Sequence, residues 1–524
     1  MMCNRFVSPS KQAYKMLRIT LQPKHNIIKK MKRLFLTVML FVSALMASAA
    51  DADTTRVGMP RLVVGVIVDQ MRWDYLHYYS RLFASGGFRR LLDEGYSCDN
   101  CLISYVPTVT AAGHSCVYSG SIPAITGIAG NNFYIAGKKV YCTDDASVST
   151  VGSSTDAGKM SPRNMRVTTM ADALKMAQDF KSKTIGISLK DRGAILPAGH
   201  TADAAYWFDN DEGVFISSTY YMEEMPEWVS DFNSANRQTG DIRYTPTGNQ
   251  LVADLAIAAI DGEGLGQGET TDFLAVSFSS TDYIGHRYGT RAPQTVEVYS
   301  QLDAQLASFL DALDNAVGKD NYLLFLTADH AAAHNADLMQ SHGIPAGRWM
   351  ETAELDNMNT YMQRAFSTSA PLVKDYMEYR VYLDHDAIRE AGLSEEVVTD
   401  SLLGYLRADD RVAYAVAFSR AAMETIPQPL LSRITRGYNA KRSGDIQVVL
   451  QPGYYGFGDD SYADGTTHGA WYPYDSHIPL LFMGWHVPHG SSPRHVDVTD
   501  ICATICSLLG IQVPDGCIGE PIVF

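Results

Sequence analysis

The amino-acid sequence predicts an α/β fold in which a mostly parallel central sheet carries helices on both faces. Two observations predict it. Short, continuous apolar runs rich in β-branched residues recur along the chain, and such runs are typical of strands buried on both faces of a parallel sheet. Helix-like segments separate these runs, and right-handed crossovers between parallel strands place such helices on both faces of a sheet. The predicted strands are residues 62–68, 183–189, 272–278, 322–326, 445–450 and 478–483.

The segments between these strands follow the same scheme. The first is helix-like and stops at Gly95, a common residue at a helix C-terminus. Residues 137–166 are rich in Gly, Ser and Asp, which indicates a loop. The aromatic, mixed segment 206–244 indicates a surface excursion that shapes a pocket. The predicted helices are residues 88–94, 168–179, 249–261, 293–316 and 497–509.

Residues 370–450 interrupt this alternation. Strand-like segments at 379–383 and 413–418 accompany helix-like segments at 386–391 and 395–407, which predicts an inserted α+β subdomain. We expect it to lie within one domain that spans residues 51–524. A chain of 524 residues that is 46% hydrophobic and 19% charged has an ordinary globular composition and ample length for a large core.

The first 50 residues have the pattern of a secretory signal peptide. They contain nine Lys or Arg and no Asp or Glu, and a basic cluster precedes the apolar run 34–46 and the small residues 47–50. We therefore expect cleavage near Ala49 or Ala50 and a periplasmic or secreted protein; Met31 is an alternative start. An uncleaved anchor is less favoured, because a spanning helix needs about 20 apolar residues.

The rest of the chain is strongly acidic. Residues 51–524 contain 34 Lys or Arg against 58 Asp or Glu. Such a surface argues against a nucleic-acid partner and against stable contact with an anionic membrane. Basic residues at an anion site would therefore have to be local. We expect a monomer, although no motif fixes the oligomeric state.

Seven cysteines follow the predicted signal peptide, so at least one has no partner within the chain. An exported location permits disulfides. The CxxC pattern of Cys98 and Cys101 favours a structural role, either as one local disulfide or with partners such as Cys142. Cys502 and Cys506 lie four residues apart in an apolar helix and are expected in the core. The seven are Cys98, Cys101, Cys116, Cys142, Cys502, Cys506 and Cys517.

Charged side chains follow several of the predicted strands. Asp69, Asp282 and Asp329 come after three of them, and Lys190 and Arg192 come after a fourth. In parallel α/β sheets, ligands bind outside the carboxyl ends of the strands. A single Asp in this position is usually a helix cap, but several at one sheet edge indicate a site.

Histidines accompany these carboxylates and complete a candidate metal site. Mixed imidazole and carboxylate ligands suit zinc with open positions for water or substrate. Six such residues exceed what one tetrahedral ion takes, so we predict two ions, an arrangement that stabilises both oxygens of an in-line phosphoryl transfer. The candidate ligands are Asp69, Asp282, His286, Asp329, His330 and His468, with Thr110 as a possible seventh.

The stretch 104–134 contributes a hydroxyl to this site. Thr110 precedes a small-residue run that is typical of the first turn of a helix, where the helix dipole favours an alkoxide or a phosphate. A metal ion would make this hydroxyl a usable nucleophile. Lys190, Arg192 and an Asn from the loop 127–132 would bind the other phosphate oxygens.

Six motifs carry a resemblance to a known family. They are VGVIVDQMRWDYL, PTVTAAGH with GIAGNN, SLKDRGA, SSTDYIGH, LTADH and GTTHGAW, and they occur in family order over about residues 60–490. The sequence resembles the alkaline phosphatase superfamily, in particular the phosphate-irrepressible (PafA-like) alkaline phosphatases and the related nucleotide pyrophosphatases/phosphodiesterases. The resemblance implies an alkaline-phosphatase-like catalytic domain.

The resemblance also implies a role for each candidate residue. Thr110 would be the nucleophile, Asn131 would contact a phosphate oxygen, and Lys190 and Arg192 match a cation pair of the monoesterase branch. One zinc would be held by Asp282, His286 and His468, and the other by Asp69, Asp329, His330 and Thr110.

These assignments describe an exported di-zinc alkaline phosphatase that hydrolyses small phosphate monoesters through a phosphothreonine intermediate. Two alternatives remain open at the level of the sequence. The first is a phosphodiesterase or nucleotide pyrophosphatase of the same superfamily. The second is a non-catalytic exported protein that binds phosphate or metal.

Overall fold

An 11-stranded sheet forms the centre of the fold in this computed structural model, which describes residues 58–458 and 465–524. Its strands are β1 (Leu62–Val68), β2 (Tyr96–Leu102), β5 (Thr150–Val151), β6 (Thr184–Ser188), β7 (Ala204–Asp209), β8 (Val214–Ser218), β9 (Asp272–Phe278), β10 (Tyr322–Thr327), β17 (His477–Ile478), β18 (Leu480–Gly484) and β19 (Gly490–Asp497). The order across the sheet is β17-β2-β18-β10-β1-β9-β6-β7-β8-β5, and β19 pairs with β2.

The middle of this sheet is parallel. β10, β1, β9, β6 and β7 are neighbours that all run in the same direction. Every residue of β1 and β9 is buried, as the continuous apolar runs predict. The flanking pairs of β18 with β10 and of β8 with β7 are antiparallel. The predicted α/β fold class is therefore confirmed, with a mixed sheet whose centre is parallel.

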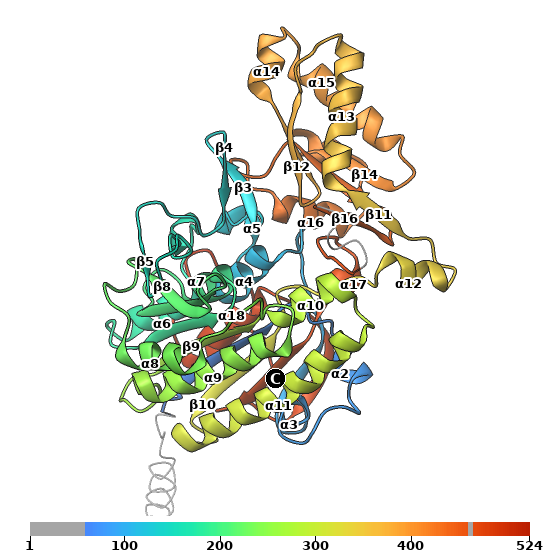
Figure 1. Cartoon of the computed structure of the whole chain (residues 1–524). Helices are drawn as coiled ribbons and strands as arrows, with labels where there is room; N and C mark the ends of the chain where they lie inside the picture. Colours follow the sequence, from blue (N-terminus) through green and yellow to red (C-terminus); the bar gives the residue numbers. More distant parts are fainter. Residues whose placement is uncertain (1–57, 459–464) are drawn as a thin grey trace, which may run out of the picture. The chain divides into compact units, whose positions relative to one another are not determined.

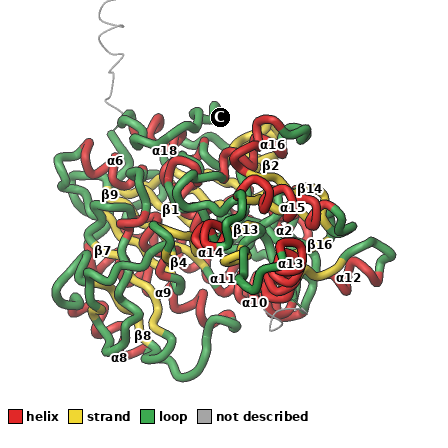
Figure 2. The backbone as a smooth tube through the Cα atoms, turned by 90° about the horizontal axis from the view of Figure 1, so that it is seen from above, coloured by secondary structure: helices red, strands yellow, loops and turns green. Residues whose placement is uncertain are grey.

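Helices cover both faces of the sheet (Figure 1; Figure 2 gives the view from above). The helices within each layer contact one another. One layer contains α3 (Phe88–Glu94), α8 (Glu227–Asn236), α9 (Pro246–Glu263), α10 (Ser280–Tyr288) and α11 (Pro293–Ala316). The other contains α4 (Thr110–Ser119), α6 (Met170–Ala177), α7 (Asp191–Ala198) and α18 (Asp500–Leu509).

Shorter elements occur along the rest of the described chain. The small strands are the hairpin β3 (Asn132–Ile135) and β4 (Lys138–Tyr141) and the parallel pair β11 (Gly347–Met350) and β16 (Tyr454–Phe457). The short helices are α2 (Tyr75–Tyr78), α5 (Pro123–Thr126), α12 (Ala336–Ser341), α16 (Leu430–Gly437) and α17 (Pro473–Ser476), with 3₁₀ turns at Pro162–Asn164 and Phe418–Met423.

A second, four-stranded antiparallel sheet lies in residues 351–450, which we call the inserted subdomain (orange and yellow at the top of Figure 1). Its strand order is β12-β13-β15-β14. It has a hydrophobic core of its own, which includes Val381, Leu402 and Val448. Its strands are β12 (Val373–Met377), β13 (Arg380–Leu383), β14 (Val412–Ala417) and β15 (Ile446–Leu450), and its helices are α13 (Glu351–Phe366), α14 (His385–Glu390) and α15 (Glu395–Arg407).

Two predictions about strands are wrong. The segment 445–450 does not continue the central sheet, because β15 pairs with β13 and β14 in the inserted subdomain. A short buried apolar run fits either sheet, so its sequence cannot choose between them. The segment 206–244 is not a surface excursion throughout, because β7 and β8 at its start are buried strands of the central sheet.

The disulfide prediction is also wrong. Cys98 and Cys101 are buried free thiols on β2, and Cys142 is a buried free thiol as well. Residues three positions apart on a strand point to opposite faces, which keeps Cys98 and Cys101 apart. Cys502 and Cys506 lie in the core, as predicted.

The predicted signal peptide, residues 1–50, lies outside the described residues. Within the described part of the chain, no helix combines the length and the apolar character that a membrane crossing requires.

Candidate active site

Four adjacent parallel strands bring the predicted site residues to one edge of the central sheet. β10, β1, β9 and β6 lie side by side. Asp69 directly follows β1, Asp329 follows β10, and Lys190 follows β6 as the N-cap of α7. Asp282 lies in the first turn of α10, which begins after β9. The carboxyl ends of these strands therefore gather the charged side chains, as expected for a parallel sheet.

One group of possible metal ligands consists of Asp282, His286 and His468. Asp282 and His286 are four residues apart in α10, so they share a helix face. Nε2 of His286 lies 3.1 Å from Oδ1 of Asp282, and Nε2 of His468 lies 3.8 Å from the same oxygen. His468 comes from the segment before α17, more than a hundred residues along the chain. Three donor atoms thus converge on one point.

A second group of possible ligands surrounds His330. Its Nε2 lies 3.5 Å from Oδ1 of Asp69, 3.4 Å from Oδ2 of Asp329 and 3.3 Å from Oγ1 of Thr110. All four side chains are at most 1% exposed. The two named carboxylate oxygens are buried and have no hydrogen-bond partner among the described residues. Buried polar atoms normally have a partner, so these two indicate a ligand that completes them.

Backbone carbonyl groups orient the three histidines of the site. Nδ1 of His286 lies 2.8 Å from the carbonyl oxygen of Thr466, and Nδ1 of His468 lies 2.7 Å from that of Thr108. Nδ1 of His330 lies 3.1 Å from the carbonyl oxygen of Ala331. A carbonyl oxygen only accepts, so each Nδ1 donates to the backbone and each Nε2 faces the carboxylates of the site. Such backbone contacts orient metal-binding histidines. The residues present therefore fit bound metal cations.

Lys190 neutralises part of the carboxylate charge. Its Nζ lies 2.5 Å from Oδ2 of Asp69 and 2.6 Å from Oδ2 of Asp282, and the side chain is 1% exposed. Burial raises the pKa of Asp69 well above its usual value, and the charges of Asp282 and Asp329 add to this effect. Burial opposes ionisation of Asp282 too, but His286 and Lys190 outweigh it and hold the pKa of Asp282 well below its usual value. Such crowded carboxylates favour a nearby cation.

Thr110 and Asn131 meet at the N-terminus of α4. Thr110 is the first residue of this helix, and all ten of its residues are buried. Oδ1 of Asn131 accepts a hydrogen bond of 3.0 Å from the backbone N–H of Ala111. The carbonyl end of this amide is thereby engaged, which leaves its NH₂ group to donate to a ligand at Thr110. Asn132 instead begins strand β3.

Arg192 lies in the first turn of α7. Its Nη1 donates to the hydroxyl of Tyr141 at 2.7 Å, and that hydroxyl donates to Oδ1 of Asp191 at 2.8 Å. Its Nε is buried and has no hydrogen-bond partner among the described residues. The charge of Arg192 also acts on Lys190. The structure therefore brings all ten predicted site residues to one region.

Two further residues support the site and are not predicted from the sequence. The backbone N–H of Gln70 donates to Oδ1 of Asp329 at 3.2 Å, and its side-chain Nε2 donates to Oδ1 of Asp282 at 2.6 Å. Nδ1 of His114 donates to the carbonyl oxygen of Thr110 at 2.9 Å and lies 3.4 Å from Oδ2 of Asp329. Their positions within the motifs VDQ and AAGH are the only signal that the sequence offers.

We expect Gln70→Asn to weaken metal binding about 10- to 100-fold, the usual cost of removing a residue that orients a ligand. Gln70 has φ of 65°, which Asn adopts more readily than most residues, so the shorter side chain loses only its reach to Asp282. Competition with a chromogenic chelator measures the affinity. The control is Gln178→Asn, since Gln178 bonds Ser182 and Thr271 away from the site. Equal affinities in both variants would contradict this role.

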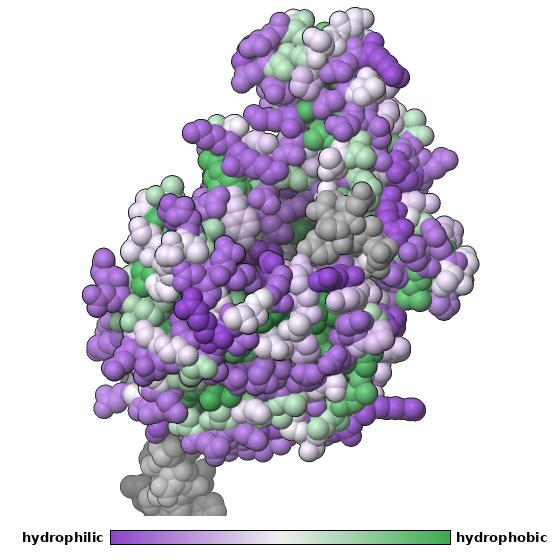
Figure 3. Space-filling model, viewed as in Figure 1, coloured by the Kyte–Doolittle hydropathy of each residue, from purple (hydrophilic) through white to green (hydrophobic). Residues whose placement is uncertain are grey.

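The surface is hollowed between the edge of the sheet and the inserted subdomain, and mainly hydrophilic residues surround the hollow (Figure 3).

Comparisons with known proteins find relatives that match most of the chain. The family model for type I phosphodiesterase / nucleotide pyrophosphatase matches residues 63–471, which include all ten candidate residues. Alkaline phosphatase PafA of Elizabethkingia meningoseptica is 42% identical over 90% of this chain and 95% of its own length. Alkaline phosphatase PhoV of Synechococcus elongatus is 42% identical over 89% of this chain and 93% of its own. A crystal structure of PafA matches with a TM-score of 0.86 at 42% identity, and covers 89% of this chain and 99% of that chain.

Proposed function

Because the chain belongs to the type I phosphodiesterase / nucleotide pyrophosphatase family, we propose that it is an exported di-zinc alkaline phosphatase that hydrolyses phosphate monoesters through a phosphothreonine at Thr110. Two curated relatives at 42% identity carry the name alkaline phosphatase, which supports a phosphatase. The predicted signal peptide supports export, and the excess of acidic residues supports small phosphate esters rather than nucleic acid as substrates.

Two groups of side chains would hold the metals. Asp282, His286 and His468 would hold one zinc ion, and Asp69, Asp329, His330 and Thr110 would hold the other. When bound, the two ions supply positive charge that lowers the pKa of the Thr110 hydroxyl and stabilises the attacking and leaving oxygens. Imidazole nitrogens mixed with carboxylates suit zinc better than magnesium or calcium, which prefer oxygen ligands.

Thr110 has the surroundings of a nucleophile. Its Oγ1 lies at the N-terminus of α4, where the helix dipole favours negative charge on an alkoxide or a phosphate. In the first step Oγ1 forms a bond to phosphorus while the bond to the ester oxygen breaks and the alcohol leaves. In the second step water attacks the phosphothreonine, so that phosphate leaves and Oγ1 is restored.

Lys190, Arg192 and Asn131 would bind the other phosphate oxygens. Contacts between ionised groups strengthen with the charge of the ligand, so two cations favour a dianionic monoester over a singly charged diester. The diester also carries a second substituent that needs space. The observation that carries the monoesterase assignment is therefore the position of Lys190 and Arg192 at the N-terminus of α7, beside the carboxylates of the site.

The test is hydrolysis of nitrophenyl phosphate and of bis-nitrophenyl phosphate by zinc-loaded protein. We expect the wild type to prefer the monoester. Lys190→Ala/Arg192→Ala should lose most of that preference, by about 10²- to 10³-fold, because removal of one charge-assisted contact in a buried site costs about 1.5–3 kcal/mol. The ratio of kcat/KM for the two substrates measures the preference for the monoester.

A matched control is Lys175→Ala/Arg163→Ala. Lys175 pairs with Asp203 and Arg163 pairs with Asp145, both outside the candidate site. This variant should keep the preference of the wild type. Faster hydrolysis of the diester, or an unaffected Lys190→Ala/Arg192→Ala variant, would replace the monoesterase by a phosphodiesterase. Hydrolysis of neither substrate would favour a binding protein.

A further inference from the structure

The β12–β13 hairpin of the inserted subdomain extends its turn to the candidate active site. Met377 pairs with Arg380, so the turn consists of Glu378 and Tyr379. Both have positive φ, 51° and 64°. Two-residue turns of this shape favour Asn and Gly, because larger side chains are strained there. Strain of this kind persists where the surroundings hold the backbone, and it is found most often at functional sites.

Contacts on both sides hold this turn. Glu378 accepts the backbone N–H of Asn131 with both carboxylate oxygens, at 3.0 and 3.2 Å. A Cβ at position 130 would collide with Oε2 of Glu378, so Gly130 is needed for this close approach. Arg380, 1% exposed, donates to the carbonyl oxygen of Ala129 at 2.6 Å. The inserted subdomain therefore holds two neighbouring peptide groups of the 129–131 loop.

A second contact joins Asn131 to α4, the helix that begins with Thr110. Oδ1 of Asn131 accepts the N–H of Ala111, the residue after Thr110. Glu378 thus fixes the backbone of Asn131, and the Asn131 side chain is fixed against α4. Because the backbone and the side chain of Asn131 are both held, its NH₂ group points in one direction. This lowers the entropic cost of phosphate binding.

Neighbouring groups offset part of the cost of burying Glu378. Burial raises the pKa of Glu378 to about 7, although Arg380 and the backbone N–H groups of Asn131 and Asn132 oppose this effect. Glu351 lies behind the turn, and its Oε1 accepts the backbone N–H of Glu378 at 3.0 Å. The charge of Arg192 also reaches Glu378. A buried carboxyl group contributes little to packing, so the position of Glu378 favours a specific role.

We propose that Glu378 is a positioning residue for Asn131, through which the inserted subdomain sets the phosphate-binding amide of the active site. This inference rests on the proposed function where it takes Asn131 as a ligand of phosphate. Glu378 itself acts through Asn131 and does not touch the substrate.

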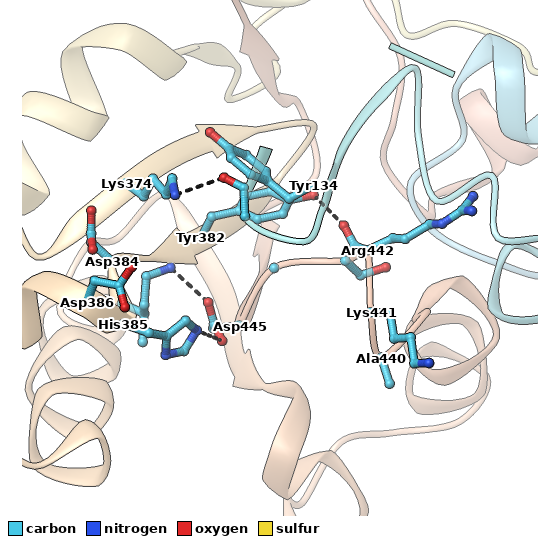
Figure 4. A pocket seen from close by; sticks show the side chains of 14 residues that line it. Tyr134, Lys374, Tyr382, Asp384, His385, Asp386, Ala440, Lys441, Arg442 and Asp445 are labelled. Carbon is cyan, nitrogen blue, oxygen red and sulfur yellow. Dashed lines mark hydrogen bonds and ion pairs between the residues drawn. The ribbon is translucent and has the colours of Figure 1, made fainter. Parts of the chain in front are cut away.

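A neighbouring contact of the same subdomain supplies the control. Asp375 of β12 accepts the hydroxyl of Tyr134 at 3.1 Å and Nζ of Lys139 at 2.9 Å, so it binds the β3–β4 hairpin but not Asn131. Figure 4 shows the cavity of about 340 Å³ beside this contact, with Tyr134 and Tyr382 against each other in its wall. Replacement of Asp375 by Ala should therefore weaken the same interface and leave the contact between Glu378 and Asn131 unchanged.

The experiment compares Glu378→Ala, Glu378→Gln, Asp375→Ala, Asn131→Ala and the double variant Glu378→Ala/Asn131→Ala. Two quantities are measured on the zinc-loaded full chain. Hydrogen–deuterium exchange reports on the N–H groups of Asn131 and Ala111, and calorimetry gives the affinity for inorganic phosphate. Thermal unfolding shows whether each variant folds.

We expect Glu378→Ala to speed exchange at both N–H groups and to weaken phosphate binding about tenfold, the scale of one hydrogen bond to a charged ligand. Glu378→Gln should stay near the wild type, because its amide oxygen still accepts an N–H. Asp375→Ala should change neither quantity. In the Asn131→Ala background, Glu378→Ala should have no further effect on phosphate affinity, because the two residues act as one unit.

Three results would overturn the proposal. They are unchanged exchange at Ala111 in Glu378→Ala, an equal loss of phosphate affinity in Asp375→Ala, and additive losses in the double variant. Failure of the phosphatase assignment gives a different pattern: the wild type would not hydrolyse nitrophenyl phosphate, while the exchange data would still decide whether Glu378 holds Asn131.

Discussion

Thr110→Val is expected to lower kcat for nitrophenyl phosphate by at least about 10³-fold, because it removes the nucleophile and leaves only binding and electrostatic contributions. Val has nearly the shape of Thr, and the hydroxyl of Thr110 contacts only His330 among the described side chains. The fold should therefore be kept. The measurement is steady-state hydrolysis, followed by mass spectrometry of protein quenched in acid during turnover.

The quenched wild type should carry one phosphoryl group on the peptide that contains Thr110, and the Thr110→Val variant should carry none. Thr504→Val is the matched control, since the buried hydroxyl of Thr504 bonds the backbone of Asp500 and Ile522, away from the candidate site. A Thr110→Val protein that keeps more than a tenth of the wild-type kcat would rule out the phosphothreonine.

Asp282→Asn is expected to remove bound zinc and to lower kcat/KM by at least about 10²-fold. Asp282 is the carboxylate of the first group, and it also lies within reach of Asp69 and His330 of the second group, so the loss of its charge should weaken both sites at once. Asn keeps the shape of Asp and a single acceptor oxygen, which separates the effect of charge from that of packing. Elemental analysis of the dialysed protein gives the zinc content, and titration with zinc during the assay gives the concentration for half activity.

Asp445→Asn is the control for this change. Asp445 pairs with His385 in the inserted subdomain, with 3.1 Å between Oδ1 and Nε2, and takes no part in the candidate site. Two zinc ions per chain are expected in the control and in the wild type. A full complement of zinc in Asp282→Asn would contradict the ligand assignment, and treatment of the wild type with a chelator should reproduce the loss of activity.

The residues at the strand ends could be predicted because their positions follow from local sequence. Asp69 and Lys190 each stand where a buried apolar run ends, and parallel strands place such ends at one edge. The fold class followed from the same runs. Roles within the site were drawn from the motifs, which occur in the order of a family.

Residues that act across long separations could not be predicted in this way. Glu378 binds a residue 247 positions away, and the side chain of Gln70 binds one 212 positions away. Both lie just after a strand, Gln70 after β1 and Glu378 after β12, but the local sequence does not indicate the distant partner of either. β2 was missed for another reason: its sequence YSCDNCL lacks an apolar run, and its neighbours β18 and β19 come from the far end of the chain.

Lys190 gives the polypeptide a counter-ion of its own, and this bears on the stability of the folded chain. Three buried carboxylates without a cation would repel one another and oppose folding. Proteins that rely on metal for this neutralisation stay unfolded until the metal arrives. Here the ammonium group of Lys190, which lies between Asp69 and Asp282, is part of the chain itself. Lys190 therefore offsets part of the repulsion among these carboxylates from within the polypeptide itself.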